Sequence, residues 1–218
     1  MRALKFITIV GIWWIGALCY ADTHNVTPSI YKVTINKVEL YNSTTGEWVT
    51  VGEGEMTFDI ASVNAGAIVG GYVSGKAIPE GTYTKMRVTV SRHMRIKATI
   101  NVSGTDYYTT STSQTFNLGG GNQVTAVIGS SNVSLYSEGE VVTPSQSSGE
   151  HYQVNGDYFT DTQTFPSPFI VKKGITKKVI IKFNVTDSGS FYDGSSPPNW
   201  GSTPFFYPGT PSASVEVE

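Results

Sequence analysis

Histidine, cysteine and acidic side chains could bind a metal or catalyse a reaction, but their spacing in this chain favours neither. The three histidines, His24, His93 and His151, form no His-x-x-x-His pair, and the single cysteine is Cys19. A zinc site uses three or four such ligands, some of them at short characteristic spacings. No Gly-x-Ser-x-Gly elbow, phosphate-binding loop or dinucleotide-binding fingerprint occurs either. We therefore predict that the protein is not an enzyme, has no catalytic residues and holds no metal or cofactor.

Closely spaced acids are the next candidates for acid–base chemistry or calcium binding. Glu53–Glu55 and Glu138–Glu140 lie beside glycines in turn-like sequence, and no apolar flank there would raise a carboxyl pKa as acid catalysis requires. Asp157–Asp161 and Asp187–Asp193 offer oxygen ligands, but without the regular acid spacing of a dedicated calcium loop. We interpret these acids as solvated loop residues, with calcium binding as the alternative for the two aspartate segments.

Asparagine residues provide a clearer pattern, because five of them begin an Asn-x-Ser/Thr sequon. These are Asn25, Asn42, Asn101, Asn132 and Asn184. Random placement of the 11 asparagines among 26 threonines and 23 serines would give roughly 2.5 sequons. The twofold excess predicts N-glycosylation, with the sugars on outward faces. The alternative is a composition rich in serine and threonine.

Aromatic residues gather in a Pro/Gly/Ser-rich segment near the C-terminus and could contact a glycan or a partner. They are Trp200, Phe205, Phe206 and Tyr207. A flat apolar ring with a polar rim suits both kinds of contact. The alternative is that the segment covers one open end of the domain.

The first 21 residues have the layout of a secretory signal peptide. Arg2 and Lys5 precede an uncharged stretch, Phe6–Leu18, and Ala21 supplies a small residue for cleavage. A helix of 13 residues spans about 20 Å, which is short of the roughly 30 Å hydrocarbon core of a membrane. A retained anchor, or acylation of Cys19, is the alternative. We predict a secreted or cell-surface protein that has no membrane segment after cleavage and no cysteine.

The remaining chain, 22–218, predicts an all-β domain of the β-sandwich type, immunoglobulin-like or transthyretin-like with Greek-key connections. Lysine and arginine number 15 against 17 acids, so the basic excess of a nucleic-acid binder is missing. Helical periodicity is weak, whereas short alternating runs separated by turn residues recur. A Ser/Thr/Gly-rich insertion at about 104–165 within one domain is expected, with a second small domain as the alternative. Expected strands are Ile30–Tyr41 (with a bulge at Asn36–Lys37), Glu47–Val51, Glu55–Ile60, Ala67–Val73, Thr84–Ser91, Met94–Val102, Asp106–Thr110, Gln123–Ile128, Asn132–Tyr136, Tyr152–Thr160, Pro168–Lys172, Lys177–Thr186 and Ser212–Glu218.

Two segments carry a resemblance to a known kind of domain. Tyr31–Tyr41 followed by Trp48, and then Ala77–Val88 with its Pro-x-Gly-x-Tyr turn, resemble a widespread secreted β-sandwich domain of uncharacterised function. Similar signatures occur in transthyretin-like and immunoglobulin-like modules. The resemblance implies a sandwich fold and supplies no catalytic residues.

The ends of the chain suggest how such a domain could act outside the cell. Asp22–Ser29 leads directly into a strand, and Ser212–Glu218 alternates with no turn after it. An unpaired strand offers its N–H and C=O groups to another chain. We therefore predict a structural subunit of an extracellular filament, a homopolymer of identical subunits joined by strand donation. In composition, leader and sequons it is similar to archaeal filaments called threads, and in such assemblies Lys37 and Asn36 are conceivable partners for a covalent crosslink.

Two other functions remain open from the sequence. The first is a secreted adhesive or carbohydrate-binding module that contacts surface glycans through the aromatics of Trp200–Tyr207. The second is a secreted hydrolase with an unrecognised site, which the few histidines and scattered acids disfavour.

Overall fold

The computed structural model describes residues 23–62, 78–149, 152–172, 179–193, 200, 203–209 and 211–217. The predicted signal peptide, 1–21, and the expected strand Ala67–Val73 lie outside these residues. The described chain is all-β, with a single short 3₁₀ helix. Within it, no helix is long and apolar enough to cross a membrane.

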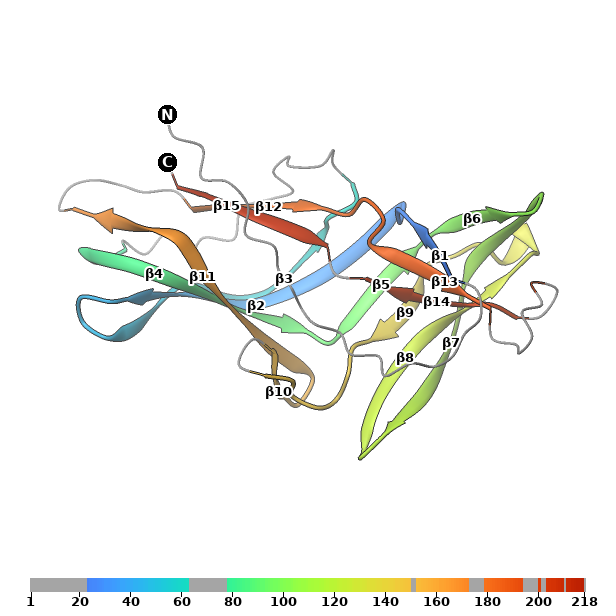
Figure 1. Ribbon diagram of the computed structural model, residues 1–218, viewed down its shortest axis with the longest axis horizontal. Helices are drawn as coiled ribbons and strands as arrows, with labels where there is room; N and C mark the ends of the chain where they lie inside the picture. The colour runs from blue at the N-terminus through green and yellow to red at the C-terminus, as the bar shows by residue number, and fades with distance from the viewer. Residues whose placement is uncertain are drawn as a thin grey trace.

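Four long strands form one end of the elongated molecule (Figure 1). Strand β2 lies between β3 and β4 and is antiparallel to both, and β4 in turn pairs with β11, which pairs with the short β10. Their bounds are β2 Ile30–Asn42, β3 Glu47–Asp59, β4 Gly81–Ser91, β10 Tyr152–Asn155 and β11 Tyr158–Val171.

The same sheet continues through β5 into the other end of the molecule. From β2 the order runs through β5, β9, β8, β14 and β13 to β1, while β6 and β7 extend it beside β8. Their bounds are β1 Thr23–Val26, β5 His93–Lys97, β6 Thr99–Val102, β7 Thr105–Gly119, β8 Asn122–Ser130, β9 Gly139–Val142, β13 Gly189–Tyr192 and β14 Phe205–Pro208. The interval expected as an insertion thus contributes several strands to the sheet.

The sheet folds over on itself, as its main core shows. Phe159 of β11 and Phe206 of β14 lie far apart in the strand order, yet both belong to one buried cluster with Tyr31 and Ile96. A second cluster contains Leu40, Tyr83 and Met86, among others. The all-β, sandwich-like fold expected from the alternating runs is therefore confirmed.

The predictions for individual strands are correct where apolar and polar residues alternate regularly. The predicted bulge in β2 is confirmed, because its register shifts between Ile35 and Lys37 against both neighbouring strands. The expected strand Asn132–Tyr136 is wrong: Val133–Leu135 is a 3₁₀ helix, and the Asn132 side chain accepts a hydrogen bond from the Ser134 N–H. An asparagine that binds backbone two residues ahead stabilises a turn instead of a strand.

Both end strands are paired within the chain. β1 is antiparallel to β13, with Thr23 opposite Tyr192 and Val26 opposite Gly189. The C-terminal β15, Ser212–Val217, pairs with β12, Val179–Asn184, in a two-stranded sheet of its own, and Figure 1 shows the two side by side. The expectation that these ends are unpaired is therefore wrong.

Hydroxyl groups join two pairs of neighbouring strands across the ladder. Thr34 of β2 and Thr57 of β3 place their Oγ1 atoms 2.7 Å apart, and Thr115 of β7 and Thr125 of β8 place theirs 2.9 Å apart. Such pairs are one way in which facing strands stabilise each other. They follow from the high serine and threonine content of the sequence.

Candidate ligand-binding face

The aromatic residues expected to contact a glycan are largely structural. Phe206 is fully buried and Tyr207 is 4% exposed, and burial raises the pKa of Tyr207 well above its usual value. Phe205 packs edge-on against Phe116, with ring centroids 4.9 Å apart. Trp200 lies against Tyr107 at 5.3 Å and adjoins the main core. The predicted contact role is thus wrong for Phe206 and Tyr207, because almost none of either side chain reaches the surface.

The five sequons differ in accessibility. Asn25, Asn101 and Asn132 are exposed and Asn184 is half-buried, whereas Asn42 is only 1% exposed. The Asn42 side chain donates to the Glu80 carbonyl and accepts from the Thr44 N–H. The expectation of an outward face is therefore wrong for Asn42, whose amide is part of the β2–β3 turn.

Two of the acids singled out by sequence form ion pairs. Glu138 pairs with Lys32, and Glu140 pairs with His93, each at 2.7 Å. Across the described ranges, no group of three or more histidine, cysteine and acidic residues could hold a metal ion.

A different group of side chains forms the candidate site, on the face of β3, β2, β4 and β11 that points away from the second core cluster. Val38 and Leu40 belong to that cluster, so the residues alternating with them on β2 point to the opposite side. The same alternation holds on the other strands. We call this surface the outer face and define it by Lys37, Glu39, Tyr41, Trp48, Lys85, Arg87, Thr89, Thr160, Thr162 and Thr164.

A buried carboxylate anchors two cations on the outer face. Glu39 is 6% exposed, and its Oε1 lies 3.0 Å from Lys37 Nζ. Arg87 Nε donates to the other oxygen, Oε2, at 2.8 Å, and Arg87 Nη2 forms an ion pair with the same oxygen at 2.8 Å. A buried carboxylate needs such partners, because its desolvation is costly. The two cations are therefore held in fixed positions, each about one-third exposed.

Two aromatic rings lie beside these charges. Tyr41 and Trp48 face each other across β2 and β3, with ring centroids 5.3 Å apart. Arg87 Cζ lies 4.4 Å from the centroid of Trp48, and Lys85 Nζ lies 5.8 Å from that of Tyr41. Each ring is thus covered on one side by a cation from β4, within the range of a cation–π interaction.

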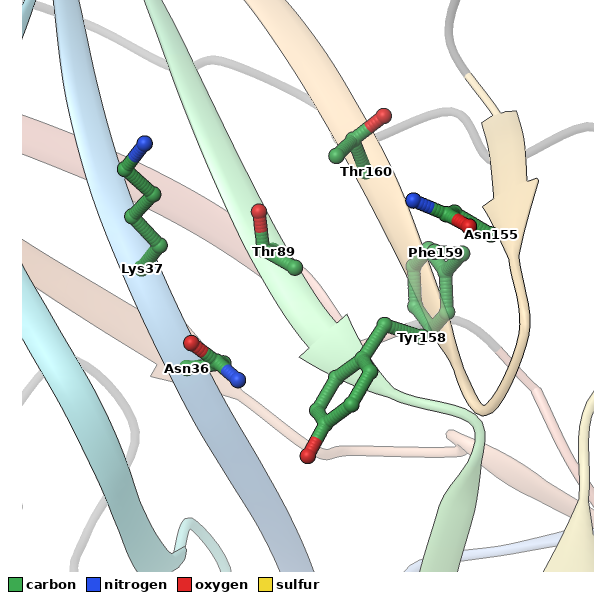
Figure 2. A pocket seen from close by; sticks show the side chains of 7 residues that line it. All are labelled: Asn36, Lys37, Thr89, Asn155, Tyr158, Phe159 and Thr160. Carbon is green, nitrogen blue, oxygen red and sulfur yellow. The ribbon is translucent and has the colours of Figure 1, made fainter.

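A shallow hollow of about 180 Å³ continues the outer face towards β10. Figure 2 shows Lys37, Thr89 and Thr160 on neighbouring strands, with Tyr158 and Asn36 below them. Tyr158 donates to Glu55 of β3, and this hydrogen bond raises the pKa of the tyrosine. The hollow is smaller than the roughly 300–1,000 Å³ of typical small-molecule pockets, so it fits one group of a larger ligand better than an enclosed cofactor. Lys37 belongs to both the hollow and the charged cluster.

Part of this face follows from the expected strand Thr84–Ser91. The alternation of Lys85, Arg87 and Thr89 with apolar residues is visible in the sequence and places these three side chains together. Their contacts with β2 and β3 depend on how these strands are aligned with one another. The periodicity of a single strand does not reveal that alignment.

Comparison with known protein families identifies a family whose function is unknown. A family model described as "Domain of unknown function (DUF4382)" matches residues 29–195. No curated protein matches the chain, and no solved structure does. The matched segment includes β2, β3, β4 and β11, and therefore the whole outer face.

Proposed function

Since the chain belongs to the DUF4382 family, a domain of unknown function, we propose its function from the outer face: an exported, non-enzymatic module that binds acidic polysaccharides. Export rests on the predicted signal peptide. The adhesive role rests on a polar, half-exposed sheet surface that carries cations, aromatic rings and hydroxyl groups together.

The main observation in support of this proposal is that a cation lies over each aromatic ring of the outer face. A neutral sugar stacks on a bare aromatic ring, whereas Trp48 and Tyr41 are each already covered on one side by Arg87 and Lys85. Cations fixed by a ring or a carboxylate are instead suited to meet an anionic group, because little side-chain entropy is lost on binding. Carboxylate or sulfate groups of an acidic glycan are the matching chemistry.

The donors of Arg87 support the same ligand. Glu39 binds Lys37 and Arg87. Lys85 lies beside them on β4, and Glu53 of β3 lies opposite Lys37. Arg87 uses Nε and Nη2 for Glu39, and a guanidinium has five N–H donors in all. The remaining N–H groups of Arg87 are the donors that would bind a ligand.

Threonine hydroxyls extend the polar surface beside the cations. Thr162 lies opposite Arg87 and Thr164 opposite Lys85 in the β4–β11 ladder. Paired residues of neighbouring strands point to the same side of a sheet. The resulting rows of hydroxyl groups could hydrogen-bond successive sugars of an extended chain, which a flat sheet accommodates better than a deep pocket does.

Lys85→Gln is the sharpest test of this proposal, because Lys85 is exposed and Glu39 keeps both of its partners in the variant. We expect the protein without its leader to bind a polyuronate but not a neutral glucan, measured by calorimetry. The affinity should fall as salt is added, and about tenfold in the variant, or about 1.4 kcal/mol.

Lys97→Gln is the matched control. Lys97 Nζ lies 4.2 Å over the Tyr136 ring, which is the same type of contact, but on β5 opposite Ile30 at the other end of β2. Binding should be unchanged in this variant. Failure of every acidic glycan to bind, or equal losses in the two variants, would refute the proposal.

The second candidate is a filament subunit that polymerises by exchanging a strand between identical subunits. The observation that favours it is the separate β12–β15 pair, in which the C-terminal strand has one ladder partner outside the large sheet. Exchange of β15 between copies would replace this contact with an identical one at low energetic cost.

Electron microscopy of the native protein tests the second candidate. Ordered fibres are expected, and deletion of Ser212–Glu218 should leave a folded monomer that forms none. Deletion of Asp22–Ser29 is the comparison, since β1 pairs within the large sheet. Discrete monomers of the full chain at every concentration, by light scattering, would exclude strand exchange.

A further inference from the structure

Two of the five sequons share a pair of hydrogen bonds, of which Asn42 makes only one, from the Thr44 N–H. Asn132 Oδ1 accepts from both the N–H and the hydroxyl of Ser134, at 3.0 and 2.8 Å. Asn184 Oδ1 accepts in the same way from Thr186, at 3.0 and 2.7 Å. In both cases the donors belong to the third residue of the sequon itself. Because a backbone N–H can only donate, the contact identifies the bonded atom as Oδ1 and places Nδ2 on the opposite side of the carboxamide.

Nδ2 is the atom that a glycan must reach. Neither Asn132 nor Asn184 donates a hydrogen bond from Nδ2 to any described residue, and both sequon hydroxyls, on Ser134 and Thr186, are exposed. Asn132 is the N-cap residue of the 3₁₀ helix after β8. Asn184 is the last residue of β12, paired with Ser212, and a turn follows it. A turn at the surface can enter an enzyme's active site more readily than a strand bonded on both sides.

In the other three sequons, the amide or the hydroxyl bonds a group outside the sequon. Asn101 Nδ2 donates to Asp106 Oδ1 at 2.7 Å, and Asn42 Nδ2 donates to the Glu80 carbonyl in a buried site. Asn25 Oδ1 accepts a hydrogen bond from the Ser190 hydroxyl at 2.8 Å. The hydroxyl of its sequon, on Thr27, accepts from the Asp187 N–H, so the two groups of this sequon do not bond each other.

We propose that Asn132 and Asn184 are the N-glycan acceptor sites of the folded protein, and that Asn42 is excluded. The reaction needs a lipid-linked oligosaccharide and a host transferase. Nδ2 attacks the anomeric carbon, a C–N bond forms, and the C–O bond to the pyrophosphate breaks. The lipid pyrophosphate leaves, and the amide gives up one proton. The hydrogen bonds to Oδ1 fix the orientation of each carboxamide and leave its Nδ2 accessible to the transferase.

Transfer to the folded protein in vitro tests the proposal. The unglycosylated chain without its leader is incubated with lipid-linked oligosaccharide and a single-subunit oligosaccharyltransferase that modifies short peptides of all five sequons. Glycopeptide mass spectrometry then gives the occupancy of each site. In the folded protein we expect glycans at Asn132 and Asn184 and none at Asn42. Unfolding the chain first should remove this selectivity.

The Asp106→Ala variant tests whether glycosylation can be gained at Asn101. It removes the acceptor that engages Asn101 Nδ2, so occupancy at Asn101 should rise. Asp157→Ala, a change at an exposed acid in the β10–β11 turn, should leave all five occupancies unchanged. Modification of Asn42 or Asn101 as complete as that of Asn132 in the folded parent protein would overturn the proposal. So would the absence of glycans at both Asn132 and Asn184.

Discussion

Replacing Phe206 by alanine is expected to lower the free energy of unfolding by about 3–5 kcal/mol. The ring is fully buried in the main core and lies edge-on to Phe191, with centroids 5.1 Å apart. It also packs directly over Gly189, where an added Cβ would come within 2.4 Å of the ring. Urea denaturation followed by circular dichroism measures the loss.

Phe205→Ala is the matched control, since the neighbouring ring has the same size but is only partly buried. Its loss of stability should be clearly smaller. A Phe206→Ala variant as stable as the parent protein would contradict the burial of this ring and would restore the sequence-based interpretation of Phe206 as a glycan contact.

Replacing Gly139 by alanine is the second substitution with a large expected effect, a loss of about 2–3 kcal/mol from overpacking. The added Cβ would meet both methyl groups of Val127 at 2.4 and 2.5 Å, and the Thr110 carbonyl oxygen at 2.5 Å. Because the last of these is backbone, no side-chain rotation relieves the clash. Thermal unfolding of the variant measures the effect.

Gly209→Ala serves as the comparison, because its added Cβ would approach the nearest atoms of Ser188 only to 3.4 Å. We expect little change there. Adding Val127→Ala to Gly139→Ala should recover part of the stability but not all of it, since the contact with Thr110 remains. Full recovery would show that the backbone contact is unimportant.

The strands themselves could be predicted because their apolar residues alternate with period two. Ile30–Tyr41 and Thr84–Ser91 correspond closely to β2 and β4. The bulge in β2 was visible for the same reason: alternation changes phase at Asn36–Lys37. Periodicity along one strand is a local property, so it can be read from sequence without knowing the neighbours of that strand.

The candidate site could not be predicted in full, because it depends on pairing between distant segments. Arg87 meets Glu39 from 48 residues away, and the contact requires a register that the bulge in β2 determines. The partner of the C-terminal strand is equally non-local. Its alternation indicated a strand correctly, but could not indicate that β12 pairs with it.

Local composition misled the interpretation of the C-terminal aromatics. A segment rich in proline and glycine usually forms an exposed loop, yet Phe205–Pro208 is a strand between β13 and β8. The strands that surround Phe206 determine that it is buried. Nothing in the sequence of Phe205–Pro208 indicates this burial.

The threonine pairs that link β2 to β3 and β7 to β8 affect how the domain responds to salinity. Hydroxyl pairs carry no net charge, so dissolved ions screen them far less than they screen exposed ion pairs. A domain joined in this way is expected to keep its strand contacts in dilute water and in brine alike. If the outer face binds an acidic polymer as proposed, rising salt would weaken that binding without disturbing the scaffold that carries it.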